Sequence, residues 1–190
     1  MHREDFDIFN SGIIYLDNAA TTMKPKCVIN AINDYYTKYT ANAHRGDYDN
    51  SLKVDDEYEG VREKVKNFIN ANSVNEIVFT SGSTQSFNMV IFGFMSNYLK
   101  KDDEVILNKG EHASNLLPWL VLSKSIGFNI KYAKLDENNN LTIDSIKEEI
   151  TDKTKVISIA HISNTIGDIR DVESIGNICK EKNILFVLDA

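Results

Sequence analysis

Polar residues able to do chemistry follow several segments that the sequence predicts as β-strands. Ser83 and Thr84 offer hydroxyl groups, His112 an imidazole, Asn164 an amide and Asp189 a carboxylate. Hydroxyl and amide groups can hold an anion, an imidazole can transfer protons near neutral pH, and a carboxylate can pair with a cation. Ligand sites in open α/β sheets gather at the carboxyl ends of the strands, so we expect these residues at one edge of a sheet.

Each of these residues also has an ordinary structural interpretation. His112 can start a helix, Asn164 can shape a turn, and Asp189 can cap a following helix. A single residue of this kind therefore does not identify a site, whereas the shared position after strands favours one.

The stretch 76–94 combines a predicted strand with a predicted helix. Residues 76–80 are largely β-branched or aromatic and predict a buried strand, and apolar residues 87, 90, 91 and 94 recur at helical spacing. Ser-Gly-Ser-Thr lies between them and opens the helix, where free N–H groups and the helix dipole attract anions. The turn is a plausible phosphate cradle that includes Ser83 and Thr84, but this stretch by itself favours an ordinary helix start with a Ser or Thr N-cap.

Predicted strands and helices alternate from residue 104 onward. Strands are expected at 104–107, 130–133, 156–160 and 184–188, and helices at 114–126, 143–150 and 172–182. Gly127 and Asn183 are expected to stop helices, and Thr142 and Asp171 to cap them. This alternation predicts an α/β fold, with three α/β/α layers around a mostly parallel, mixed sheet.

The preceding part of the chain predicts one strand and two helices. The apolar residues 13–16 predict a short strand, and Pro25 is expected in the first turn of a helix. Residues 40–50 are polar and predict a loop, after which Ser51 is expected to cap a helix with apolar residues spaced three or four apart.

The composition is that of an ordinary soluble globular chain, with 42% hydrophobic and 26% charged residues. The formal net charge of −7 disfavours a nucleic-acid or an anionic membrane partner. The first residues do not resemble a secretory signal, and no apolar run approaches the ~20 residues of a membrane span. Cys27 and Cys179 lack C-x-x-C spacing, so we expect a reducing cytoplasmic location and two inert, buried thiols.

Two other kinds of site find little support. The histidines His44, His112 and His161 have no ligand-like spacing with either cysteine, so no metal site is predicted. The sequence contains neither G-x-G-x-x-G nor a P-loop motif, which disfavours a nucleotide-binding domain.

As a set, six motifs resemble those of the class-V aminotransferase family of pyridoxal-phosphate enzymes, most closely the Suf/Csd-type (group II) cysteine desulfurases. They are Tyr-Leu-Asp-Asn-Ala-Ala-Thr-Thr at 15–22, Ala-Asn-Ala-His-Arg-Gly at 41–46, Phe-Thr-Ser-Gly-Ser-Thr at 79–84, Glu-His-Ala-Ser-Asn-Leu-Leu-Pro-Trp at 111–119, Ser-Asn-Thr-Ile-Gly at 163–167 and Asp-Ala at 189–190. They follow the family's order, and the resemblance extends from about residue 15 to residue 190. It implies the large-domain fold of pyridoxal-phosphate transferases.

The resemblance implies a role for each candidate residue. Ser83 and Thr84 would bind the cofactor phosphate, and His112 would stack on the pyridine ring and assist proton transfer. Asp189 would pair with the protonated ring nitrogen, and Asn164 would reach the phenolic edge of the cofactor or the substrate carboxylate.

The same resemblance assigns residues to the substrate side and divides the chain into domains. Ala20 and Thr21 would line the substrate pocket, and His44 and Arg45 would lie at its mouth near a second subunit of a homodimer. Residues 1–18 would belong to the small-domain side, and residues 19–190 would form the N-terminal part of the cofactor-binding large domain. The rest of that domain and the C-terminal small domain are expected to be absent.

The sequence departs from the family's pattern at several positions. Ala113 stands where the branch often has a second histidine, and no histidine follows His44-Arg45-Gly46. The Ser-x-His-Lys block with the Schiff-base lysine is absent, and neither cysteine matches the persulfide-forming one. We therefore expect these 190 residues to be inactive alone.

The leading prediction is the N-terminal part of a cysteine desulfurase that converts L-cysteine to L-alanine and a persulfide, with a sulfur-acceptor protein as a further partner in iron–sulfur cluster assembly. The alternatives are another family member, such as a selenocysteine lyase, and a non-catalytic module that acts in binding or dimerisation. A downstream reading frame that encodes Ser-x-His-Lys would favour the enzyme.

Overall fold

The computed structural model describes residues 2–190 and divides them into two compact units, one ending at Phe79 and the other spanning Thr80–Ala190. The units are described separately below. The predicted boundary at residue 18, between a small-domain side and a large domain, stays a prediction.

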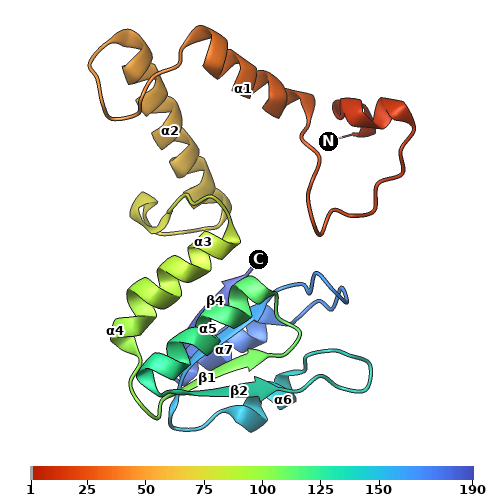
Figure 1. The fold of residues 1–190 in the computed structure, drawn as a ribbon, viewed down its shortest axis with the longest axis vertical. Coiled ribbons are helices and arrows are strands. Elements are labelled where there is room, and N and C mark those ends of the chain that lie inside the picture. Colours follow the sequence, from red (N-terminus) through yellow and green to blue (C-terminus); the bar gives the residue numbers. More distant parts are fainter. Residues whose placement is uncertain (1) are drawn as a thin grey trace. The chain divides into compact units, whose positions relative to one another are not determined.

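A parallel sheet forms the centre of the second unit (Figure 1). Its strands are β1 (Glu104–Asn108), β2 (Asn129–Ala133), β3 (Thr154–Ala160) and β4 (Leu185–Asp189), in the spatial order β2-β1-β3-β4. All three strand pairings are parallel. Ala160 lies opposite Asp189, so β3 and β4 reach the carboxyl edge of the sheet together.

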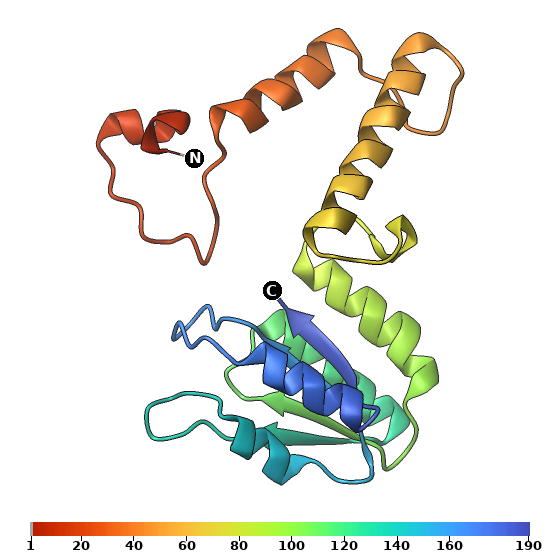
Figure 2. The same cartoon turned by 180° about the vertical axis from the view of Figure 1, so that it is seen from behind.

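Helices cover both faces of this sheet (Figures 1 and 2). One face carries α5 (Ala113–Ile126) and the helical run 83–98, which consists of α3 (Ser83–Asn88), the π-helical segment Met89–Met95 and α4 (Ser96–Tyr98). The other face carries α6 (Ile143–Glu149) and α7 (Val172–Glu181). The predicted three-layer α/β/α class is confirmed.

Alternation along the strands separates two apolar cores. In β1, Val105 and Leu107 belong to the core with Trp119 of α5, whereas Ile106 between them belongs to the core with Ile146 of α6. Successive side chains of a strand point to opposite faces, so three consecutive apolar residues in the middle of β1 fit a sheet that has helices on both faces.

The predicted helix caps at Thr142 and Asp171 and the predicted helix stop at Gly127 are confirmed. The side chains of Thr142 and Asp171 accept hydrogen bonds from Ser145 N (3.2 Å) and Ser174 N (3.0 Å), as N-caps do. Gly127 ends α5 with a φ of 89°, in the left-handed region that glycine adopts without strain. These caps help to explain why the predicted bounds of the elements after residue 104 differ from the observed ones by only one or two residues.

The first unit is mainly helical. It contains two 3₁₀ turns (Arg3–Asp5 and Asp7–Ser11), α1 (Lys26–Lys38), α2 (Asp49–Phe68) and a third 3₁₀ turn (Val74–Glu76). The helix after Pro25 is confirmed, with Pro25 at its N-cap. The expected cap at Ser51 is wrong, because α2 begins at Asp49. The Ser51 hydroxyl instead donates to the Asn42 carbonyl (3.2 Å).

Two predicted strands are also wrong. Residues 13–16 form no strand, and Ile14 and Leu16 are 81% and 89% exposed. Residues 76–80 end the 3₁₀ turn and then run without a strand partner, with Val78 64% exposed. β-branched residues favour an extended backbone, but a strand also needs a neighbour to receive its hydrogen bonds, and none lies among the described residues.

No helix within residues 2–190 combines the length and the apolarity that a membrane crossing requires.

Candidate functional site

The start of α3 is an uncapped helix terminus. Gly82 precedes the helix with a φ of 155° and offers no side chain for capping, so the alternative of a Ser or Thr N-cap is wrong. The first backbone hydrogen bond of the helix runs from Ser86 N to Gly82 O (3.1 Å). The N–H groups of Ser83, Thr84 and Gln85 therefore have no acceptor among the described residues and remain available to an anion.

Hydrogen bonds hold the turn before α3 in shape. The side-chain oxygen of Gln85 accepts from the backbone N–H and the hydroxyl of Ser81, at 2.7 and 2.8 Å. Thr80 Oγ1 lies 2.8 Å from Ser86 Oγ and accepts a bond from Gly82 N at 3.3 Å. The free N–H groups are thus presented by a preorganised loop, which lowers the entropy cost of holding a ligand.

A chain of three side chains joins this helix start to α5. Thr84 Oγ1 lies 2.8 Å from Ser114 Oγ, which in turn lies 2.9 Å from His112 Nδ1. The backbone N–H of Ser114 also donates to His112 Nδ1 (3.2 Å), so His112 is the N-cap of α5.

These contacts indicate the tautomer of His112. A backbone N–H can only donate, so Nδ1 is the acceptor and the proton of the neutral imidazole lies on Nε2. The Ser114 hydroxyl then also donates to Nδ1, and it accepts from the Thr84 hydroxyl. The candidate phosphate cradle and the candidate proton-transfer group therefore share one hydrogen-bond chain.

Asp189 and Ser83 line the same cavity. This cavity has a volume of about 260 Å³, and its walls come from the start of the helical run and the end of β4: Ser83, Ser86, Phe87, Val90, Val187, Leu188, Asp189 and Ala190. Burial raises the pKa of Asp189, and the nearby charge of His112 acts in the opposite direction. The sheet edge thus brings together four of the predicted site residues, namely Ser83, Thr84, His112 and Asp189.

Known proteins with this architecture identify the family. The class-V aminotransferase family model matches residues 14–190. The chain belongs to the class-V aminotransferase family. The resemblance inferred from the motifs is confirmed.

Similar proteins are named as cysteine desulfurases. A probable cysteine desulfurase of Borreliella burgdorferi is 47% identical over 194 residues, which cover 99% of this chain and 46% of that protein. The apo structure of a cysteine desulfurase from Thermococcus onnurineus superposes with a TM-score of 0.92 at 36% identity and covers 99% of this chain and 46% of its own. A solved structure of SspA in complex with cysteine has a TM-score of 0.83 at 29% identity, over 94% of this chain and 50% of that one. The chain spans about half the length of the curated relatives it matches.

In this class-V chain, no side-chain hydrogen bond among the described residues joins Asn164 to the other candidates, and it does not line the cavity of Ser83 and Asp189. It is exposed in the loop after β3 and makes no side-chain hydrogen bond with a described residue. The loop is shaped instead by Ser163, whose hydroxyl accepts from the N–H groups of Thr165 and Ile166 (3.3 Å each). The role of Asn164 stays a prediction.

The four predicted substrate-side residues lie in the first unit. Ala20 and Thr21 belong to a turn closed on Asp17 O, with both N–O distances at 3.2 Å. His44 has a φ of 58° and lies beside Glu59, with 3.3 Å between Nε2 and Oε1, whereas Arg45 is exposed. Their assignment to the pocket stays a prediction.

The two cysteines differ from the expectation in one respect. Cys179 is buried, and burial raises its pKa to about 11, so its thiol is protonated at neutral pH. Cys27 is exposed, so the expectation of burial is wrong for it. No cluster of metal-ligating side chains occurs in residues 2–190.

Sequence reasoning missed Ser114. The sequence could have indicated it, because the hydroxyl of a serine two residues after a histidine at a helix N-cap can reach the histidine ring. Its contact with Thr84 bridges 30 positions of sequence and could be found only in the fold.

Proposed function

We propose that this chain is the cofactor-binding part of a pyridoxal-phosphate-dependent cysteine desulfurase. The reaction is L-cysteine plus an enzyme thiol giving L-alanine plus an enzyme persulfide, so the sulfur leaves the substrate carbon and forms a bond to the thiol sulfur. One observation carries the proposal: the uncapped α3 start and the Asp189 carboxylate line one cavity, and His112 is joined to that start by hydrogen bonds.

The start of α3 would hold the phosphate of the cofactor. Three free backbone N–H groups and the positive end of the helix dipole favour a phosphate dianion at this position. Ser83 and Thr84 would add hydroxyl contacts. For Thr84 this requires its proton to turn from Ser114 toward the phosphate, which links phosphate binding to the state of His112.

Asp189 would pair with the ring nitrogen. Bound pyridoxal phosphate supplies an electron-withdrawing ring that stabilises negative charge at the α-carbon of an amino acid. An ionised Asp189 keeps the ring nitrogen protonated, and its half-buried position strengthens the ion pair relative to one in water.

His112 would stack on the ring and move protons at Nε2. Its Nδ1 is occupied by the Ser114 N–H, so the ring orientation is set by α5 and the second nitrogen is free to act. A neutral imidazole with Nε2–H is suited to proton transfer near neutral pH.

The remaining candidates would form the substrate side. Ala20 and Thr21 would line the pocket, Asn164 would contact the cofactor or the substrate carboxylate, and His44 and Arg45 would lie at the mouth near the second subunit of a homodimer. L-cysteine is the substrate, a choice supported by the names of the relatives.

The activity would supply sulfur for iron–sulfur clusters through a sulfur-acceptor protein. A cytoplasmic location fits the two free cysteines. Residues 19–190 would constitute the N-terminal part of the large domain.

Binding of pyridoxal phosphate, compared with dephosphorylated pyridoxal, tests the proposal directly. We expect pyridoxal phosphate to bind the 190-residue chain at least ~10-fold more tightly, because only it engages the α3 start. Isothermal titration calorimetry measures both affinities. Equal affinities, or no binding of either compound, would reject the cradle and the proposed function with it.

A further inference from the structure

Glu111, Asp168 and Arg170 form a buried cluster of charged side chains, which we name the edge clamp, and Glu111 directly precedes His112 in the sequence. Arg170 and Glu111 have fully buried side chains, and that of Asp168 is 5% exposed. Arg170 Nη1 forms an ion pair with Glu111 Oε1 and donates to Ala160 O (3.2 Å). Arg170 Nε donates to Asp168 Oδ2 at 3.2 Å. One guanidinium therefore contacts two carboxylates and the last residue of β3.

The Glu111 arm of the edge clamp fixes the segment before α5. Glu111 Oε2 accepts hydrogen bonds from Ala160 N (2.8 Å) and from the Asn115 side chain (2.9 Å). Asn115 is itself held by Ser158 Oγ (2.6 Å) and by Trp119 Nε1 (3.2 Å). His112 directly follows Glu111, so its backbone is attached to this buried network.

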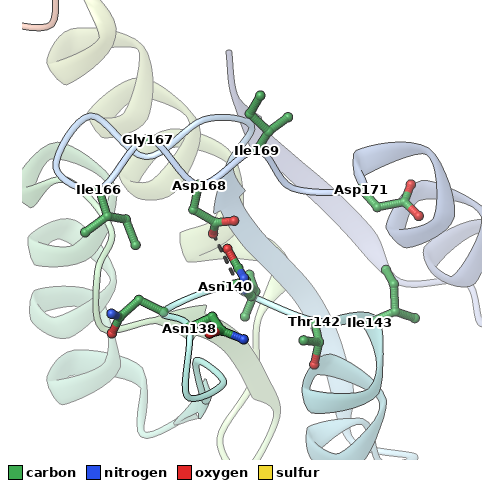
Figure 3. A pocket seen from close by; sticks show the side chains of 11 residues that line it. Asn138, Asn140, Thr142, Ile143, Ile166, Gly167, Asp168, Ile169 and Asp171 are labelled. Atoms are coloured by element: carbon green, nitrogen blue, oxygen red, sulfur yellow. Dashed lines mark hydrogen bonds between the residues drawn. The ribbon is translucent and has the colours of Figure 1, made fainter.

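The Asp168 arm fixes the loop that carries Asn164. Asp168 Oδ2 also accepts from Leu141 N (3.3 Å). Both residues line a cavity of about 810 Å³, and Figure 3 shows Asp168 among the lining side chains with a dashed line from its carboxylate. Backbone bonds from Ser163 N to Asp168 O (3.0 Å) and from Arg170 N to His161 O (2.9 Å) close the loop on itself. The loop thereby returns to the end of β3.

We propose that Arg170 is a positioning residue that holds the His112 segment and the Asn164 loop against the end of β3. The inference rests on the proposed function, because it gives Arg170 its purpose through the roles of His112 and Asn164. Only a planar guanidinium offers several donors in fixed, divergent directions, and a lysine ammonium in its place would be a single point charge.

Stability alone is a poor reason for this cluster. Buried ion pairs are often no more stabilising than apolar side chains of similar volume, because desolvation offsets their attraction. The edge clamp also leaves Arg170 Nη2 without a partner among the described residues, which adds a cost. What the cluster provides is a defined geometry at two loops that carry candidate site residues.

The ring nitrogens of His112 report this geometry without any cofactor. In the wild-type chain, Nδ1 accepts from Ser114 N, so nitrogen-15 NMR of the ring should show one tautomer with Nδ1 unprotonated. Loss of the edge clamp should make the backbone at Glu111 and His112 mobile. The His112 ring would then leave its hydrogen bond with Ser114 N, and its nitrogen-15 shifts would become an average of the two tautomers. His112→Gln identifies the resonance among the histidines of the chain.

The experiment records this signature in two variants of the 190-residue chain and in a control. Arg170→Lys keeps the cation but cannot make all of the guanidinium contacts. The double variant Glu111→Gln/Arg170→Met removes both charges together, and so keeps the test decisive if the lysine variant does not fold. Ile146→Ala is the control, since Ile146 is fully buried in the apolar core on the face of the sheet opposite α5 and its side chain cannot take part in the hydrogen bonds of the edge clamp. Its melting temperature should fall without a change at His112.

We expect tautomer averaging of His112 in the clamp variants and the wild-type signature in Ile146→Ala. A folded clamp variant with wild-type His112 shifts would overturn the proposal, as would equal averaging in Ile146→Ala. A failure of the proposed function would be seen separately, as a wild-type chain that shows one His112 tautomer but does not bind pyridoxal phosphate.

Discussion

Thr84 Oγ1 and Ser114 Oγ lie 2.8 Å apart, although 30 positions separate them in the sequence. The contact joins the uncapped start of α3 to the start of α5, and Ser114 continues it to His112 Nδ1 at 2.9 Å. A ligand that takes up the Thr84 hydroxyl must therefore alter the hydrogen bonding of the imidazole. The coupling is local and depends on one serine hydroxyl.

Replacing that serine tests the coupling. Ser114→Ala removes both hydroxyl contacts while the backbone N–H cap of His112 remains. Because Ser114 Oγ competes with the phosphate for the Thr84 proton, its removal should raise the affinity for pyridoxal phosphate about 3- to 10-fold, the effect of one or two ordinary hydrogen bonds. Fluorescence titration measures this affinity. Ser123→Ala is the matched control, because its hydroxyl donates to Leu120 O within the same helix, away from the site. An unchanged affinity in Ser114→Ala would show that the hydrogen bonds from Thr84 through Ser114 to His112 have no role in cofactor binding.

Gly82 is expected to be required for the backbone at the start of α3. Its φ of 155° is rarely adopted by other residues, and an added Cβ would meet no atom within 4 Å, so strain is the only cost of substitution. We expect Gly82→Ala to lose about 1–3 kcal/mol of unfolding free energy or to distort the turn. Urea denaturation and phosphate-dependent cofactor binding measure the two effects.

Gly93→Ala provides the comparison for Gly82. Gly93 also has open space around its Cβ position, but its φ is not in the left-handed region. Alanine should be tolerated there or should increase stability, since it favours helices more than glycine by about 1 kcal/mol. If both variants behave alike, the φ of Gly82 does not matter to the site.

Asp189 is expected to be essential in a complete enzyme. Asp189→Ala should lower turnover by more than ~100-fold, because the ring nitrogen would lose the carboxylate that keeps it protonated. Steady-state kinetics with L-cysteine measure the loss. Near-normal turnover would remove Asp189 from the mechanism.

The same carboxylate should reduce stability at neutral pH. Burial raises the folded-state pKa of Asp189 above its unfolded value, so the folded protein holds this proton more tightly. Its contribution to stability is present at low pH and is lost as the pH rises through the folded pKa. Asp189→Asn should therefore increase the melting temperature at pH 7 and have little effect at low pH. A lower melting temperature at pH 7 would contradict this account.

Two substitutions should distinguish the capping role of His112 from its proposed catalytic role. His112→Ala removes the N-cap of α5 and should cost about 1 kcal/mol of unfolding free energy. His112→Asn restores a good capping side chain but not a titratable ring, so a full-length enzyme with this variant should be stable, retain cofactor and lose activity. Thermal unfolding and sulfide assays distinguish the two roles. Full activity in His112→Asn would exclude proton transfer by His112.

The sequence predicted the second unit more accurately than the first. Strands after residue 104 are rich in apolar residues, and the helices between them carry local caps such as Thr142 and Asp171, so the hydrophobic pattern and the capping residues predict the same elements. Residues 13–16 and 76–80 have the same β-branched character but find no partner strand among the described residues. Strand pairing is a long-range property, and residue type alone does not supply it.

The candidate site shows the same division between local and distant information. Ser83, Thr84, His112 and Asp189 could be proposed because each follows a predicted strand, and the fold brings them to one edge of the sheet. The edge clamp could not be predicted. Arg170 lies 59 positions from Glu111, and an arginine near a turn is ordinarily an exposed residue.

The 190-residue chain alone is expected to bind pyridoxal phosphate reversibly and without turnover. The cavity shared by Ser83 and Asp189 is lined by no lysine, and covalent attachment of this cofactor requires a lysine amine. Borohydride reduction followed by mass spectrometry should therefore detect no specific lysine adduct, and added L-cysteine should release no sulfide. Thr84→Val serves as the binding control, because it keeps the shape of the side chain and removes the hydroxyl that faces Ser114. Cysteine-dependent sulfide, or one defined lysine adduct that Thr84→Val weakens, would show that these residues already form a complete catalytic site.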